Sequence, residues 1–403
     1  AVSVNKADTA LPLFKTALEA NPKIEQFWLS YIDALIREKQ FNSAKQLLEQ
    51  AQKQGVNGEK LDVLNKQLVP ISQTENAEVT SPSQQQQNSL LEHYKNGRYN
   101  DAEKLATSLT REFPKYQLGW KVLSAILGQT GRNSEALSAN QTAVQLAPQD
   151  ATAHTNLGIT LKVLGRLKEA EASHLQAIAL KPDFAGAHYN LGITLKELGK
   201  LEEAEASHVQ AIALKPDYAE AYNNLGNTFK ELGRLEEAEA SHLQAIVLKP
   251  DYAEAHNNLG FTLQELRRLE EAEASYRQAT ELKPDLAKAH TNLGSTRKEL
   301  GRLEEAVVSY IQAIVLKPDL AEAYNNLGIT HQELGRLEEA ESSYVQAITL
   351  KPDYGEAHRY LTTLKKFTLK DKQYLKMLDL YRDQDISEGQ RCHINFGLAK
   401  VYE

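Results

Sequence analysis

Six asparagines recur every 34 residues and are the side chains of this sequence best suited to act together chemically. They are Asn156, Asn190, Asn224, Asn258, Asn292 and Asn326. Each carboxamide offers a hydrogen-bond donor and an acceptor, so one asparagine can hold one peptide group of an extended chain through two hydrogen bonds. Three more asparagines directly precede members of this row, at Asn223, Asn257 and Asn325. The two rows predict recognition of a polypeptide backbone.

Lysines follow the same interval and form a second candidate row. They are Lys162, Lys196, Lys230 and Lys298, with Gln264 and Gln332 at the same place in two units. Such a row could attract acidic side chains of a bound peptide. Glutamates follow three of the lysines directly, at Glu197, Glu231 and Glu299, and would neutralise them. The pattern therefore favours a solvated, charge-balanced face over an anion-binding one.

Histidines also recur, but their spacing argues against a metal site. They lie at His154, His188, His256, His290 and His358, and in a second row at His174, His208 and His242. Zinc needs three or four ligands that converge on one point, whereas a 34-residue period spreads them along the molecule. Other units carry tyrosine at these two positions, for example Tyr222 and Tyr276. This exchange indicates helix-interface positions that take a flat ring with a polar tip. No metal or cofactor is expected.

Catalysis by this chain is not expected either. A catalytic site needs a nucleophile, a base and an orienting group in one constellation. The polar residues that stand out here belong instead to the repeating pattern, so the sequence predicts a binding protein that is not an enzyme.

Two helices and two breaks account for each 34-residue unit. In the unit 219–252, apolar and small residues follow a helical spacing up to Gly233, which accepts the left-handed conformation at a helix end. A second helix follows and stops at Lys249 and Pro250. Asp217 and Glu220 have the spacing of a capping box for the first helix. The same Asp-x-x-Glu pattern recurs at Asp251 and Glu254, Asp319 and Glu322, and Asp353 and Glu356.

The period and its marker residues resemble the tetratricopeptide repeat. A small residue stands at the eighth position of each unit, alanines at the twentieth and twenty-seventh, and proline at the thirty-second. Full units are expected at 117–150, 151–184, 185–218, 219–252, 253–286, 287–320 and 321–354, with diverged units at 25–58 and 83–116. The resemblance implies an all-α fold, a right-handed superhelix or α-solenoid of antiparallel helix pairs.

In this family the first helices line a concave groove, and the sixth position of each unit points into it. Neighbouring helices lie about 8–10 Å apart and an extended peptide rises about 3.3 Å per residue. One asparagine of the row would thus meet about every third ligand residue. The row is similar to the asparagine array in the repeat region of O-GlcNAc transferase, which holds peptide backbones. The alternative, that Asn-Leu-Gly is family consensus kept for solubility or local hydrogen bonds, stays open.

The chaperone-binding members of the family provide a negative comparison. Their carboxylate clamp needs lysine at the fifth position and asparagine at the ninth. The fifth position here holds Thr155, Tyr189, Asn223, Asn257, Thr291 and Asn325, and only Asn227 fits at the ninth. A receptor for chaperone tails is therefore not expected.

Four segments are expected along the chain. Residues 1–70 form a first repeat segment closed by a capping helix at 59–68, and 71–84 form a Gln- and Ser-rich linker within a polar stretch from Ser72 to Asn88. Residues 85–354 form the main array, and 355–403 a diverged helical segment that ends inside a further repeat.

The last segment resembles the junction in bacterial proteins where these repeats precede a sulfotransferase domain. The resemblance covers 357–403 and implies the recruiting region of a larger bacterial transferase, of which this chain is a fragment. The glycine- and arginine-containing phosphate loop of that catalytic domain has no match here. Two alternatives stay open: a free-standing adaptor or assembly scaffold, and the repeat region of a glycosyltransferase.

Composition narrows the class of partner. The net charge of −8 argues against binding to nucleic acids or anionic membranes, which would need a basic face. No apolar run approaches the length of a membrane span. The single cysteine, Cys392, excludes an internal disulfide and fits a reducing compartment, so a cytoplasmic location is expected. Secretion stays open because the natural N-terminus is missing.

Overall fold

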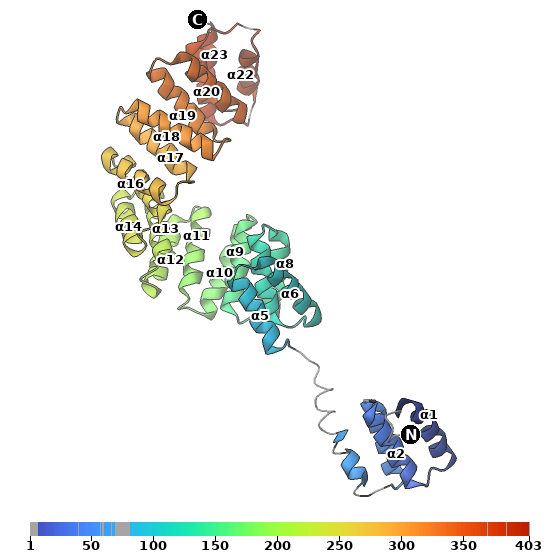
Figure 1. Ribbon diagram of the computed structural model, residues 1–403. Helices are drawn as coiled ribbons and strands as arrows, with labels where there is room; N and C mark the ends of the chain where they lie inside the picture. The colour runs from blue at the N-terminus through green and yellow to red at the C-terminus, as the bar shows by residue number, and fades with distance from the viewer. Residues whose placement is uncertain are drawn as a thin grey trace. The chain divides into compact units, whose positions relative to one another are not determined.

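The computed structural model describes residues 7–38, 40–56, 58, 60–65, 67–68, 81–368, 370–383 and 385–402. Throughout these residues the regular secondary structure is helical, as predicted (Figure 1). The chain divides into two compact units, Ala1–Leu123 and Ser124–Glu403, and each is described by itself below. None of the described helices is long and apolar enough to cross a membrane.

Among its described residues, the first unit has five helices with assigned ends and the start of a sixth. They are α1 (Ala7–Ala20), α2 (Glu25–Arg37), α3 (Phe41–Lys53), α5 (Gln84–Lys95), α6 (Tyr99–Glu112) and the first residues of α7 (Gln117–Gln129). Residues 60–65 and 67–68 are helical as well, where a capping helix is predicted. Leu61, Leu64 and Leu68 join the apolar cluster around Trp28 and Ile32. The Trp28 indole N–H donates to the Pro22 carbonyl at 2.8 Å, which ties the start of α2 to the preceding turn.

The predicted linker needs a correction at its C-terminal end. Residues 71–80 lie outside the described part, but Gln84–Asn88, assigned above to the polar stretch, lies in α5. Ser83 caps this helix: its hydroxyl accepts from the Gln86 N–H, and the Gln86 side chain accepts from the Ser83 N–H at 2.8 Å. This capping box starts a helix in glutamines that have good helix propensity. The other predicted segment boundaries stay predictions.

Seven helix pairs fill residues 117–354 with the predicted boundaries. After α7 they are α8 (Asn133–Leu146), α9 (Ala151–Val163), α10 (Leu167–Leu180), α11 (Ala185–Glu197), α12 (Leu201–Leu214), α13 (Ala219–Glu231), α14 (Leu235–Leu248), α15 (Ala253–Glu265), α16 (Leu269–Leu282), α17 (Ala287–Glu299), α18 (Leu303–Leu316), α19 (Ala321–Glu333) and α20 (Leu337–Leu350). The pattern then loosens to α21 (Gly355–Leu364), α22 (Lys372–Arg382) and α23 (Glu388–Tyr402).

The turns inside the pairs have the predicted left-handed backbone. Gly199, Gly233 and Gly301 have φ of 76°, 75° and 77°. Arg267 stands at the same place and keeps the same conformation, with φ of 62°. The turn is therefore imposed by the packing of the pair, since it forms even where the residue has a side chain.

The predicted capping boxes are wrong. Helix α13 begins at Ala219, so its N-cap is Tyr218, which makes no side-chain capping bond. Asp217 lies one residue too early, and only its carbonyl is used, as acceptor for the Ala219 N–H. The same offset applies at α15, α19 and α21, whose N-caps are Tyr252, Leu320 and Tyr354. Glu220 and Glu254 instead form ion pairs with Lys249 and Lys283. In α9 the aspartate stands one residue later, and Asp150 does cap the helix.

Stacking of the pairs sets an inner and an outer side in the second unit. Each second helix packs between its own first helix and that of the next unit. Consecutive first helices, from α9 through α21, also approach one another directly, whereas consecutive second helices stay farther apart (Figure 1). The first helices therefore line the inner, concave side, and the second helices face outward.

Rings seated on glycines hold each pair together. The rings of His174, His208, His242, Tyr276, Tyr310 and Tyr344 are fully buried against the glycine at the eighth position of their unit. A Cβ atom on Gly192 would lie 2.6 Å from the His208 ring. The small residue at this position is thus required by a close contact between the two helices.

Candidate functional site

The six asparagines of the first row lie on first helices, which line the inner side of the second unit. All six are half-buried, so part of each side chain reaches solvent. They occupy the same position on consecutive first helices, from α9 to α19. This row, with the residues beside it on the same helices, is called the inner surface below.

Neighbouring units share hydrogen bonds through these carboxamides. Asn258 Nδ2 donates to Asn223 Oδ1 at 3.0 Å, and Asn292 Nδ2 donates to Asn257 Oδ1 at 3.1 Å. Asn224 Nδ2 donates to the Tyr189 hydroxyl at 2.9 Å. Two other members of the row bond differently. Asn190 donates to the Gly186 carbonyl of its own helix, and Asn326 lies 3.5 Å from the Ser295 hydroxyl.

The second asparagine row lies deeper than predicted. Asn223, Asn257 and Asn325 were expected as possible ligand contacts, but only 5%, 8% and 0% of their surface is exposed. At Asn223 and Asn257 the side-chain oxygen accepts from the asparagine of the next unit. Because a side chain at the fifth position points between two first helices, Asn223 and Asn257 orient carboxamides of the outer row, whereas Asn325 donates to Glu356 at 3.2 Å.

The lysine row is charge-balanced, as favoured above, but across units. Lys162 Nζ lies 3.2 Å from Glu197 of the next unit, and Lys196 Nζ lies 2.8 Å from Glu231. Gln264 uses the same geometry to donate to Glu299. Lys230 instead lies over the Phe261 ring, 4.4 Å from its centroid. Each pairing joins a first helix to the one after it, so the row also ties consecutive units together. The remaining member, Lys298, is half-buried at the same position of α17.

Aromatic residues contribute to this region and were not singled out from the sequence. The Tyr189 and Tyr218 rings lie 4.8 Å apart, and Lys215 Nζ is 4.5 Å from the Tyr218 centroid. Burial, with Glu220 nearby, raises the pKa of Tyr218 to about 12, so its hydroxyl keeps its proton near neutral pH. Phe261 is partly exposed on α15, at the ninth position. The signal available in the sequence was the recurrence of aromatic residues at the last position of several units.

The histidines lie at helix interfaces, as predicted. In the first histidine row, ring Nε2 bonds the carbonyl of the proline six residues earlier, at 2.9 Å for His154 and 3.0 Å for His188. Trp120 makes the equivalent bond through its indole N–H. In the second row, both ring nitrogens of His174, His208 and His242 lack a hydrogen-bond partner. Among the described residues no group of three or more His, Cys, Asp or Glu side chains could hold a metal ion.

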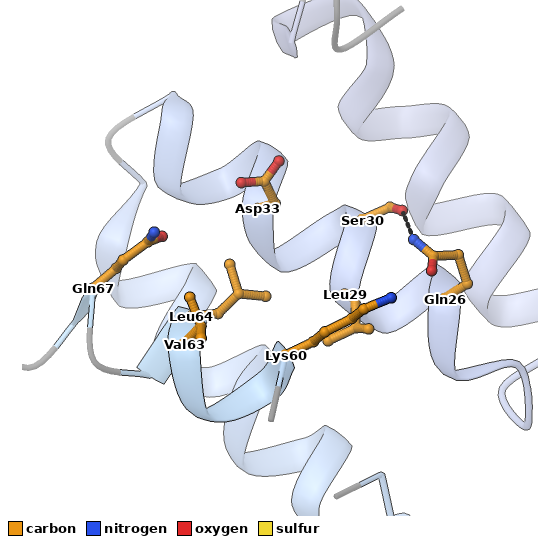
Figure 2. A pocket seen from close by; sticks show the side chains of 8 residues that line it. All are labelled: Gln26, Leu29, Ser30, Asp33, Lys60, Val63, Leu64 and Gln67. Carbon is orange, nitrogen blue, oxygen red and sulfur yellow. Dashed lines mark hydrogen bonds between the residues drawn. The ribbon is translucent and has the colours of Figure 1, made fainter. Parts of the chain in front are cut away.

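A separate cavity of about 480 Å³ lies in the first unit, between α2 and the helical residues 60–65 and 67–68 (Figure 2). Leu29 and Leu64 line it, and Gln26 donates to the Ser30 hydroxyl at its edge. Its acid, Asp33, pairs with Arg37 at 3.0 Å.

Comparison with known families identifies the type of repeat. Models of the tetratricopeptide repeat match residues 1–61, 90–151, 161–199, 194–233, 226–267, 253–286, 294–335 and 321–354, which together make up more than half of the chain. No curated protein matches the chain.

Solved structures agree at the level of the fold. The Cut9–Hcn1 hetero-tetramer of the APC/C is similar over 89% of this chain and 82% of the matched chain, with 14% identity and a TM-score of 0.54. YrrB, described as a TPR protein with an unusual peptide-binding site, matches 46% of this chain and 95% of its own, with 25% identity and a TM-score of 0.38. PilF of Pseudomonas aeruginosa matches 50% of this chain and 92% of its own, with 20% identity and a TM-score of 0.46.

Repeats of this kind typically form non-catalytic scaffolds for protein–protein interaction. The period, the helix pairs with their glycine-seated rings and the family matches along both compact units agree with one another. The chain belongs to the tetratricopeptide repeat family.

Proposed function

We propose that the inner surface of the second unit binds an extended protein or peptide segment through its asparagine row. The observation that carries the proposal is the row itself, which presents six half-buried carboxamides on consecutive first helices. A carboxamide has two N–H donors and an oxygen with two lone pairs. The bond from Asn258 to Asn223 uses one donor only, so a second N–H and acceptor capacity remain for a ligand.

Internal hydrogen bonds support this reading, because they orient the carboxamides before a ligand arrives. Ordering a side chain in advance lowers the entropy lost on binding. The same bonds also support the alternative that the row is structural, since they connect neighbouring units. An experiment must therefore separate ligand contact from inter-unit stabilisation.

The chain offers matched variants for this purpose. Asn258→Ala with Asn292→Ala removes two carboxamides of the inner surface together with two inter-unit bonds. Asn223→Ala with Asn257→Ala removes the acceptors of the same two bonds and leaves the carboxamides of the inner surface in place. Both pairs are expected to lose similar stability, because a hydrogen bond contributes about 1 kcal/mol.

Binding is measured with unstructured peptides selected from a random library on the wild-type chain. The variant lacking Asn258 and Asn292 should bind these peptides at least tenfold more weakly, and the variant lacking Asn223 and Asn257 should keep most of the affinity. Equal affinity of the first variant and the wild type would assign the row to repeat packing alone. Competition among the selected peptides shows whether they share one surface.

The biological context is a further part of the proposal. We propose that the repeats recruit a protein substrate for a bacterial transferase of the sulfotransferase type, on the basis of the resemblance of 357–403 described above. The sequence that follows residue 403 in the natural gene tests this directly: a domain with the phosphate-binding loop of sulfotransferases is expected there. A different catalytic domain, or none, would leave the peptide-binding proposal standing and remove its sulfotransferase context.

A further inference from the structure

The outer face of the second unit carries exposed aliphatic side chains at repeating positions. Five of them lie on two helices: Leu243 and Val247 on α14, and Val308, Ile311 and Val315 on α18, which are 44%, 70%, 65%, 47% and 67% exposed. These five residues are called the outer stripe. Leu175, Val209 and Val345 continue it on α10, α12 and α20.

Earlier units of the same chain show that the repeat does not require this apolar surface. The positions of Leu243 and Val247 correspond to Glu49 and Lys53 in the unit 25–58 and to Thr107 and Arg111 in the unit 83–116, all exposed. Polar and charged residues thus satisfy the outer face of a second helix. Exposed apolar residues that gather on one face usually mark an interaction site.

At one helix in the middle of the stripe, charged residues stand where the neighbouring helices have aliphatic ones. Helix α16, which follows α14 and precedes α18 in the array, places Arg277 and Glu281 where its neighbours have aliphatic residues. Both side chains are well exposed, and they lie 3.8 Å apart. Two copies of α16 packed antiparallel would bring Arg277 of each beside Glu281 of the other. The charges of α16 can therefore pair with those of a second copy of the same helix.

The ends of the second helices also carry charges that could pair between two antiparallel copies. Each of α14, α16 and α18 begins with a pair of glutamates, Glu236 and Glu237 in α14, and is followed by a lysine, Lys249 in that case. In α14 and α16 the second glutamate pairs with the arginine that precedes the helix, so the first glutamate is the charge that would face the lysine of the other copy in an antiparallel pair. A twofold symmetric dimer allows these opposite charges to pair at every helix of the interface, because each contact then occurs twice.

We propose that the outer stripe is a self-association surface, whose occupant is a second copy of this chain with its second helices antiparallel. The interface is centred on α16, with Arg277 and Glu281 of the two copies paired across the twofold axis. The aliphatic residues of α14 and α18 flank this centre. The glutamates in the first turns of α14, α16 and α18 disfavour an anionic membrane as the occupant.

Sedimentation velocity over a range of chain concentrations tests the proposal. The wild-type chain is expected to form a concentration-dependent dimer that is populated at about 100 μM chain. Val247→Glu, Ile311→Glu and Val315→Glu together should leave a monomer at this concentration. The matched control carries Leu13→Glu, Val163→Glu and Leu375→Glu, which change exposed aliphatic residues outside the stripe and add the same charge, and should still dimerise.

Charge reversal tests the antiparallel centre. Arg277→Glu alone and Glu281→Arg alone should each weaken dimerisation at least tenfold, because like charges then meet twice across the axis. Arg277→Glu combined with Glu281→Arg should restore it. Far-UV circular dichroism is used to check that each variant keeps its helical fold. A wild-type chain that stays monomeric, a control that dissociates as the stripe variant does, or a double reversal that does not restore the dimer would overturn the proposal.

Discussion

At the scale of single residues, Arg267 shows what the turn inside a helix pair costs. Its φ of 62° is left-handed, the conformation that the neighbouring units give to glycine. A side chain in that conformation costs roughly 1 kcal/mol. The ion pair between Arg267 and Glu299, 3.3 Å long and with the arginine largely exposed, offsets little of this.

Arg267→Gly should therefore stabilise the chain by up to about 1 kcal/mol. The measurement is the midpoint of urea unfolding followed by far-UV circular dichroism. Gly233→Arg is the reverse change at an equivalent turn, where a Cβ would meet no atom within 4 Å, so only the backbone conformation opposes it. It should lower the midpoint. A lower midpoint for Arg267→Gly would show that the side chain stabilises more than the backbone strain costs.

Gly192 is a second residue whose role rests on a close contact. A Cβ there would lie 2.6 Å from the His208 ring, which is fully buried. Gly192→Ala should destabilise by about 1–3 kcal/mol, the usual cost of overpacking a core. The readout is again the urea midpoint.

Two further variants test whether that loss comes from the contact with the ring. Gly128→Ala adds a methyl group in helix α7 where no atom lies within 4 Å, and should be neutral or stabilising by up to about 1 kcal/mol. Combining Gly192→Ala with His208→Ala should cost less than the sum of the single changes, because the clash disappears. Additive losses would mean that the glycine and the ring do not interact.

At the scale of elements, the second helices fall into two groups that should respond differently to acid. Helices α10, α12 and α14 carry buried His174, His208 and His242, whereas α16, α18 and α20 carry Tyr276, Tyr310 and Tyr344. Burial lowers the pKa of His174 and His208 to about 4 and that of His242 to about 3. The nearby ammonium groups of Lys162, Lys196 and Lys230 make a smaller contribution to the same shifts.

Stability should therefore fall with acid in the histidine units. The pKa of an unfolded histidine is about 6.5, so below that pH the unfolded chain binds more protons than the folded one. The contribution is complete above pH about 6.5 and is lost as the pH falls toward 4, at about 3 kcal/mol for each histidine. The triple variant His174→Tyr, His208→Tyr and His242→Tyr should lose clearly less stability than the wild type between roughly pH 7.5 and pH 5. Equal losses would locate the acid sensitivity in the carboxylates.

At the scale of the whole molecule, a chain of stacked pairs need not unfold in one step. Each pair contacts only its neighbours, so stability is spread along the array and cooperativity can break. Both tryptophans of the chain, Trp28 and Trp120, lie in the first compact unit. Their fluorescence therefore reports that unit, whereas far-UV circular dichroism reports all helices.

The two signals should give different midpoints in urea, with the fluorescence transition separate from the main loss of helix. Coincident transitions at several temperatures would show instead that the chain unfolds as one cooperative body. Trp120→Phe leaves Trp28 as the only tryptophan. Comparing its fluorescence with that of the wild type shows which part of the first unit the signal reports.

Local properties of this protein could be read from its sequence. The period predicts seven helix pairs over 117–354, and they form with those boundaries. Glycine marks the left-handed turns, and Arg267 keeps the same conformation at the equivalent place of its unit. These features depend on residues within one helix or one turn, where side-chain type and backbone conformation are directly linked.

Only the tertiary structure decided which groups meet between units. Lys196 pairs with Glu231 of the next unit and not with the adjacent Glu197, and Asn258 bonds Asn223 of the unit before it. The expected ligand contacts at Asn257 and Asn325 became buried for the same reason. Successive helix pairs are rotated against each other by the packing of their side chains. That rotation brings together groups about one repeat apart, a relation that no local spacing in the sequence expresses.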